Sequence, residues 1–123
     1  AILKKKIIIC DRFIDSTIAY QVYGKKVNKK FVNNIHKYIL KKIKPDITFV
    51  LKVNISKAFQ RLKKRKRRNR YDKFDKKFYT RAQRAFINIA KQNKKRYLIL
   101  DNSKDNSDIN NKILAKFLKL LNA

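Results

Sequence analysis

Two charged residues, Asp11 and Arg12, come directly after the short apolar run Lys6–Cys10. An arginine guanidinium can hold a phosphate group through two parallel hydrogen bonds. A neighbouring carboxylate can orient that arginine or reach a bound metal ion through water. The pair therefore predicts a phosphate-binding site at the end of a strand, and the alternative is an exposed ion pair without a ligand.

Two further polar groups follow later apolar runs. One comes after Val53, and the other is the sequence Asp101-Asn102-Ser103. If the apolar runs are parallel strands, their carboxyl ends meet at one edge of the sheet, where such sheets bind ligands. Together, the three groups predict a ligand that carries phosphate, such as a nucleotide.

The densest positive charge lies between Arg61 and Arg70, in the sequence RLKKRKRRNR. A solvated helix end or a lid over a ligand is favoured over a nucleic-acid surface, because few aromatic residues that could stack on bases stand among the basic ones. Nucleic acid is therefore expected to bind only non-specifically, through charge.

The elements that must position these groups alternate between strands and helices. Strands are expected over 6–10, 47–53 and 96–100, and helices over 16–23, 28–43, 56–62, 74–92 and 108–121. The first strand is apolar throughout, as in a strand buried on both faces, so Cys10 at its end is expected in the core. Ser56 is the expected N-cap of the third helix. This order predicts an α/β fold with a parallel sheet and right-handed crossovers.

The composition limits the class of protein. The chain has 123 residues, a net charge of +27 and 44% hydrophobic residues, so one domain with a packed core is expected over 1–123. One cysteine cannot form an internal disulfide, which indicates a reducing compartment. No apolar run reaches the about 20 residues that span a bilayer. At the start of the chain the apolar residues precede the positive charges, which is the reverse of their order in a signal peptide. Without a methionine, the chain is expected to be processed or a piece of a longer protein.

The sequence DRFIDSTIAYQ, residues 11–21, resembles the DR(Y/F)-x-x-S-(S/T/N)-x-A-Y-Q motif of thymidylate kinases. KPDITFVL, residues 44–51, is similar to the family's KPD-(L/I)-T-x-x-L strand, and RYLILD, residues 96–101, is similar to its last strand. The resemblance extends over essentially the whole chain. It implies an incomplete three-layer, parallel-sheet P-loop kinase fold, with three strands present and the first strands and the P-loop absent.

By this resemblance, the intact protein transfers the γ-phosphoryl group of ATP to dTMP, giving dTDP, with Mg²⁺ bridging. Arg12 would grip the acceptor phosphate, Asp11 would hold that arginine or the hydrated metal, and Arg65 would close over the transferring group. Thr17 would contact the thymine edge, and Tyr20 would disfavour a 2′-hydroxyl. The other implied site residues are Phe13, Ser16 and Gln21 for the nucleoside, Arg61 and Arg70 for the lid, and Asp101, Asn102 and Ser103 near the adenine.

One part of the family's machinery has no counterpart in the chain. The loop G-x-x-x-x-G-K-(S/T), which cradles the ATP phosphates and Mg²⁺, needs two glycines, and the chain has one. The chain is therefore expected to be inactive alone, as part of a cytoplasmic, homodimeric parent that serves dTTP synthesis. No residue is assigned as a metal ligand, since no Cys/His cluster has suitable spacing.

Two alternatives to the thymidylate kinase reading stay open. One is a fragment of a deoxynucleoside kinase, which also carries an Asp-Arg pair and an arginine-rich lid. The other is a small basic nucleic-acid-binding protein. The sequences Ala19-Tyr20-Gln21 and Lys44-Pro45-Asp46 favour the thymidylate kinase.

Overall fold

The computed structural model describes residues 6–65, 74–104 and 107–122. Its elements in chain order are α1 (Ile14–Thr17), the π-helix η2 (Ile18–Gly24), α2 (Lys29–Leu40), β1 (Thr48–Lys52), α3 (Ile55–Lys63), α4 (Lys76–Gln92), β2 (Tyr97–Asp101) and α5 (Asp108–Leu121). The strands β1 and β2 pair in parallel, with Thr48 opposite Tyr97 and Lys52 opposite Asp101. The expected α/β class with parallel strands is confirmed.

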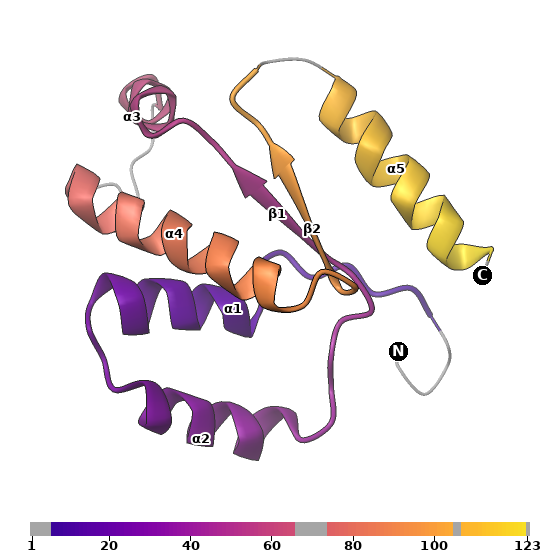
Figure 1. The fold of residues 1–123 in the computed structure, drawn as a ribbon, viewed down its shortest axis with the longest axis horizontal. Helices are drawn as coiled ribbons and strands as arrows, with labels where there is room; N and C mark the ends of the chain where they lie inside the picture. Colours follow the sequence, from indigo (N-terminus) through magenta and orange to yellow (C-terminus); the bar gives the residue numbers. More distant parts are fainter. Residues whose placement is uncertain (1–5, 66–73, 105–106, 123) are drawn as a thin grey trace.

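Helices lie on both sides of the two strands. Figure 1 shows α4 and α1 on one side of β1 and β2, with α5 alone on the other. The buried core joins Val50 of β1, Tyr97 of β2 and Ala90 of α4. Small residues of α4 allow this close approach, since Ala82, Ala85 and Ala90 are all buried. The sheet is thus held mainly by α4.

The expected first strand is not a strand. Residues 6–10 form no regular element, and all of them are exposed, Ile9 at 90%. Cys10 is exposed as well, so its predicted place in the core was wrong. Apolar β-branched residues form a strand only where a neighbouring strand supplies hydrogen-bonding partners. Among the described residues, β1 pairs only with β2, and nothing pairs with this segment.

The helices expected over 16–23 and 74–92 begin at Ile14 and Lys76 instead, and two further differences at helix ends have a clear local cause. The helix expected to reach residue 43 ends at Leu40, because Lys41 turns into a backbone conformation with φ of 49°. The N-cap of α3 is Asn54 and not Ser56. The Asn54 side chain accepts hydrogen bonds from the backbone N–H of Ser56 at 3.0 Å and of Lys57 at 3.4 Å. Asparagine is at least as favourable as serine at an N-cap.

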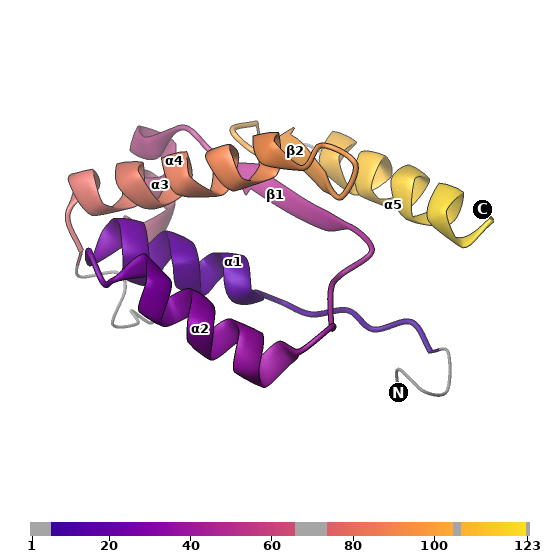
Figure 2. The same cartoon turned by 60° about the horizontal axis from the view of Figure 1, so that its bottom comes forward.

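The apolar face of α2 is mostly exposed, although its pattern predicted burial. Val32 is buried, whereas Phe31 is 60% and Ile39 is 65% exposed. Figure 2 shows α2 beneath α1 and well away from the strands. The helix has its amphipathic pattern, but the described residues offer it little surface to pack against. In the described part of the chain, no helix has the length and apolar character that crossing a membrane requires.

Gly24, at the end of η2, allows close packing against Phe78 of α4. A Cβ atom at Gly24 would lie 2.5 Å from Phe78 Cε2, and the Phe78 ring is itself buried at 3% exposure. The backbone of Gly24 does not have positive φ, so the constraint is space and not conformation.

We therefore expect Gly24→Ala to lower the free energy of unfolding by about 1–3 kcal/mol, the cost of overpacking a core. In a helix without this contact, the same change is expected to stabilise by about 0.5–1 kcal/mol. Urea unfolding followed by circular dichroism measures the change, with the exposed neighbour Lys25→Ala as control. An unchanged or higher stability of Gly24→Ala would show that the packing is looser than described.

Candidate functional site

A cleft of about 500 Å³ lies between residues 8–13 and strand β1. Several of the residues expected from the sequence line it: Asp11, Arg12, Phe13, Ser16 and Tyr20. Thr17 and Gln21 are not among its lining residues; Thr17 is exposed and Gln21 half-buried. The structure thus brings Arg12, expected to grip the phosphate, and Tyr20, expected to disfavour a 2′-hydroxyl, into one cleft. It leaves Thr17, expected at the thymine edge, and Gln21, expected to contact the nucleoside, outside that cleft.

Arg12 has a backbone conformation that arginine rarely adopts. Its φ is 68°, in the left-handed region, which costs a residue with a Cβ about 1–2 kcal/mol. Its carbonyl accepts a weak hydrogen bond from Cys10 Sγ at 3.4 Å. Its guanidinium carbon lies 5.3 Å from the ring centroid of Tyr20, within the range of a cation–π contact. Backbone strain of this kind concentrates at ligand-binding sites. There the strained conformation positions a side chain for the ligand and does not stabilise the fold.

Tyr20 is itself held by an aromatic cluster. Its ring centroid lies 5.9 Å from that of Phe78 in a stacked pair and 5.8 Å from that of Phe86 in an edge-to-face pair. Phe78 also stacks on Phe74 at 4.1 Å. Because Phe78 and Phe86 both belong to α4, this helix fixes the ring over which Arg12 is placed.

Asp15 anchors the helix that carries these residues, and sequence reasoning missed it. Its side chain is buried, and Asp15 Oδ1 accepts a hydrogen bond of 2.8 Å from the Tyr97 hydroxyl of β2. Arg96 Nη2 lies 3.6 Å from Asp15 Oδ2. The available signal was an aspartate four residues before Ala19, on the face of the helix that is buried. This contact ties the start of the site helix to the sheet.

Burial raises the pKa of Asp15 above its ordinary value of 3.8, with Arg96 and His36 opposing the rise. The folded protein therefore holds this proton to higher pH than the unfolded chain does. Asp15 thus contributes stability that is present below pH 3.8 and is lost as the pH rises through the folded pKa.

We expect Asp15→Asn to remove this loss, because the amide does not ionise but can still accept the Tyr97 hydrogen bond. The free energy of unfolding of the wild type, minus that of the variant, should fall as the pH rises from below 3.8. Urea titrations at a series of pH values measure the difference. The exposed Asp46→Asn is the control. A difference that rises with pH would show that the ion pair with Arg96 outweighs burial.

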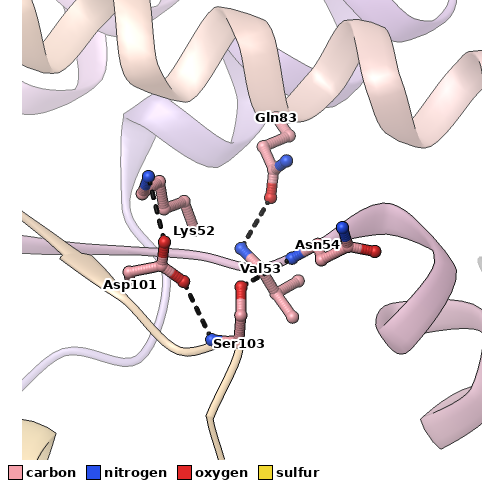
Figure 3. A network of polar contacts seen from close by, with 6 residues as sticks. All are labelled: Lys52, Val53, Asn54, Gln83, Asp101 and Ser103. Carbon is pink, nitrogen blue, oxygen red and sulfur yellow. Dashed lines mark hydrogen bonds and ion pairs between the residues drawn. The ribbon is translucent and has the colours of Figure 1, made fainter.

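A second group of expected residues meets at the carboxyl ends of the strands, as Figure 3 shows. Lys52 Nζ lies 3.0 Å from Asp101 Oδ2, and the backbone N–H of Ser103 donates to Asp101 Oδ1 at 2.9 Å. The hydrogen bonds from Ser103 and Lys52 lower the pKa of Asp101 to about 2. Across the same edge, the backbone N–H of Asn54 donates to Ser103 Oγ at 2.9 Å. The loop at Asp101 is therefore fixed against the end of β1.

Gln83 of α4 completes this edge, and sequence reasoning missed it. Its Oε1 accepts a hydrogen bond of 2.9 Å from the backbone N–H of Val53, directly after β1 (Figure 3). A glutamine on the buried side of a helix is the only signal for such a role. The contact satisfies a backbone donor at the point where the strand ends.

One lid arginine reaches the loop expected near the adenine. Arg61 Nη2 donates to the backbone carbonyl of Asn102 at 3.0 Å. Lys57 Nζ, one turn earlier in α3, donates to the carbonyl of Ser103 at 2.8 Å. Arg65 is exposed beyond the end of α3, and Arg70 lies outside the described residues. The start of the expected lid and the expected adenine loop are thus neighbours.

Among residues 6–65, 74–104 and 107–122, no three His, Cys, Asp or Glu side chains gather into one cluster. The chain also has too few glycines for a phosphate-cradling loop of the P-loop type. The described residues hold a mostly apolar and aromatic cleft that Arg12 lines. They also hold the loop at Asp101, which Lys52, Lys57 and Arg61 contact.

Comparisons of the sequence and of the fold with known proteins point to one family. The family model for thymidylate kinase matches residues 1–113. Thymidylate kinases of Ehrlichia chaffeensis and Ehrlichia ruminantium are each 38% identical to the chain, over 89% and 100% of its length. The crystal structure of thymidylate kinase from Ehrlichia chaffeensis superposes with a TM-score of 0.65 and 30% identity, covering 98% of this chain.

The match is partial in the other direction. The alignments cover 52% and 59% of the two Ehrlichia proteins and 52% of the crystallised chain, so the chain spans about half the length of these relatives. The residues that the family model matches, 1–113, include both Arg12 and Asp101. On the family model, the sequence relatives and the shared fold together, the chain belongs to the thymidylate kinase family.

Proposed function

We propose that the chain supplies the dTMP-binding and lid portion of a thymidylate kinase, an enzyme that phosphorylates dTMP to dTDP with ATP and Mg²⁺. The observation that carries this proposal is Arg12, held with φ of 68° at the cleft that Tyr20 also lines. A guanidinium in this place suits a 5′-phosphate, which it can bind through two hydrogen bonds. Tyr20, Phe13 and Ser16, which line the same cleft, would contact the nucleoside that the phosphate carries.

The other residue roles belong to the same proposal. Asp11 would orient Arg12, and Thr17 and Gln21 would contact the base from outside the described cleft. Arg65, with Arg61 or Arg70, would bring positive charge to the transferring phosphoryl group, where charge develops. Asp101, Asn102 and Ser103 would lie near the adenine of ATP; their hydrogen bonds to α3 and β1 give this loop one fixed shape.

The ATP-phosphate and Mg²⁺ sites would come from outside the described residues. The chain alone is therefore proposed to bind dTMP without transferring phosphate. The cytoplasmic location and the homodimer that the resemblance implies are proposed for the whole enzyme only.

Equilibrium binding of two isomeric nucleotides tests the proposal. With a net charge of +27, the chain will attract any nucleotide, so charge must be held constant. Thymidine 5′-monophosphate and thymidine 3′-monophosphate carry the same charge and base, and only the first presents its phosphate as the proposal requires. We expect 5′-dTMP to bind at least about tenfold more tightly, about 1.4 kcal/mol, in calorimetric titrations at 0.15 M salt. Equal affinities would mean that only charge attracts the nucleotide.

A further inference from the structure

The turn that carries Arg12 has no helix cap of its own. The φ of 68° at Arg12 is followed by extended backbone at Phe13, the N-cap of α1, whose side chain cannot accept a hydrogen bond. The backbone N–H of Ser16 donates to the Phe13 carbonyl at 2.9 Å, a local contact that closes the turn. Whatever fixes this turn relative to the cleft therefore also fixes the direction in which the Arg12 side chain starts.

Asp15, in the first turn of α1, reaches the sheet. Its Oδ1 atom accepts the hydrogen bond of 2.8 Å from the Tyr97 hydroxyl, and its Oδ2 atom lies 3.6 Å from Arg96 Nη2. Both partners are themselves fixed. The Arg96 guanidinium carbon lies 4.3 Å from the centroid of the Tyr97 ring, and the backbone N–H groups of both residues donate to the Asn93 carbonyl at 3.1 Å. Asp15 thus joins the turn beside Arg12 to the start of β2.

Stability does not account for a carboxylate at this place. The Asp15 side chain is 9% exposed, and burial raises its pKa, so the ionised form is less stable here than in water. The distance of 3.6 Å to Arg96 Nη2 is longer than the about 2.8 Å of a charge-assisted hydrogen bond. Asp15 Oδ2 and Arg96 Nε are both buried without a hydrogen-bond partner in the described part of the chain. A buried ion pair of this geometry contributes little to stability, so what Asp15 adds is the link itself.

We propose that Asp15 is a positioning residue for Arg12, and that its link to the start of β2 sets which phosphate position of a nucleotide the guanidinium can reach. The inference rests on the proposed function for the ligand of Arg12. Two anchors then hold the site. The aromatic rings of α4 hold Tyr20, and the start of β2 holds the turn that carries Arg12. If the turn moves relative to Tyr20, the guanidinium moves away from the 5′-phosphate while the nucleoside contacts at Tyr20 remain.

Removal of one hydroxyl tests the link. Tyr97→Phe removes the group that binds Asp15 and keeps the aromatic ring. We expect it to bind thymidine 5′-monophosphate about three- to tenfold more weakly than the wild type, the usual contribution of one hydrogen bond, in calorimetric titrations at about 0.15 M salt. Its affinity for thymidine 3′-monophosphate should be unchanged. Tyr38→Phe removes a hydroxyl from a residue of α2 that is 85% exposed, so this matched control should change neither affinity.

Two substitutions of Asp15 separate positioning from folding. Asp15→Asn can still accept the hydrogen bond from Tyr97, so it should keep most of the preference for the 5′-isomer, whereas Asp15→Ala should lose it. A residue that only stabilised the fold would lower both affinities by the same factor, because both isomers need the folded chain. A 5′ preference that survives in both Asp15→Ala and Tyr97→Phe would overturn the inference and leave the proposed function standing.

A double-mutant cycle shows whether Asp15 acts through Arg12. In the Arg12→Gly variant, the further change Asp15→Ala should cause no additional loss of 5′-dTMP affinity, since the guanidinium that Asp15 positions is absent. An additional loss as large as the one in the wild type would mean that Asp15 acts on the ligand by another route, and the inference would fail.

The chain without nucleotide provides an independent readout. The Arg12 guanidinium carbon lies 5.3 Å from the Tyr20 ring centroid, so the ring shifts the Arg12 Nε–H resonance in nuclear magnetic resonance spectra. We expect this resonance to move in Tyr97→Phe and to stay in place in Tyr38→Phe. An unmoved resonance in Tyr97→Phe would contradict the link. A resonance that moves, in a chain that binds 5′- and 3′-dTMP equally, would support the link and refute the proposed function.

Discussion

Replacement of Phe78 by alanine is expected to lower the free energy of unfolding by about 3–5 kcal/mol, the usual cost of emptying a buried phenylalanine site. Phe78 is 3% exposed and lies at the centre of the aromatic cluster, in contact with Phe74, Tyr20 and Gly24. It joins α4 to the helix that carries the site residues. Its loss should therefore also release Tyr20, which Arg12 faces.

Urea unfolding at fixed pH measures this change, and two variants control it. Phe78→Leu keeps most of the volume and should cost less than the alanine variant. Phe31→Ala removes the same side chain from a position that is 60% exposed, so it should stay within about 0.5 kcal/mol of the wild type. Equal losses for Phe31→Ala and Phe78→Ala would mean that the aromatic cluster is not the centre of the fold.

The second large effect concerns Arg12. We expect Arg12→Ala to weaken the binding of 5′-dTMP by about 10- to 100-fold, since a hydrogen bond to a charged group contributes about 1.5–3 kcal/mol. Arg12→Lys keeps the charge but not the paired donors, so it should recover only part of the affinity. Calorimetric titration of each variant measures the loss.

Arg12→Gly separates ligand binding from folding. Glycine adopts positive φ without strain, so this variant should unfold at the same or higher urea concentration than the wild type, whose Arg12 has φ of 68°. It should nevertheless lose dTMP affinity as fully as Arg12→Ala. A glycine variant that unfolds more easily would show that Arg12 is kept for stability and not for a ligand.

Much of the fold could be predicted from periodicity because the signal there is local. The helix over 108–121 has the predicted bounds, and β1 and β2 lie within one residue of the expected strands. These segments combine apolar spacing with clear end signals, such as the turn residues after Leu100. A parallel arrangement followed from the alternation of strands and helices.

The wrong predictions share one physical cause, because a segment becomes buried only where another segment packs against it. Residues 6–10 have the composition of a central strand and α2 has the pattern of a buried helix, yet both are exposed. The sequence reports what a segment is suited to contact, and not whether that surface is present.

The candidate site was predictable where a motif fixed it and not where tertiary contacts did. Arg12 and Tyr20 share a cleft because Arg12 lies two residues before α1 and Tyr20 lies in η2, which continues α1. Asp15 is hydrogen-bonded to a residue 82 positions later and Gln83 to one 30 positions earlier, so local sequence carries only a weak signal for either role. Asp15 holds the start of α1 against β2, and Gln83 holds the backbone just after β1.

The most direct test of the dTMP site is a map of the backbone amides that respond to the ligand. Nuclear magnetic resonance spectra of the labelled chain, titrated with 5′-dTMP at 0.15 M salt, report each amide separately. The account predicts the largest shifts from Cys10 to Tyr20 and along β1, and their absence in Arg12→Gly. Shifts spread over the basic residues after Arg61, equal for 5′- and 3′-dTMP and unchanged in Arg12→Gly, would contradict it.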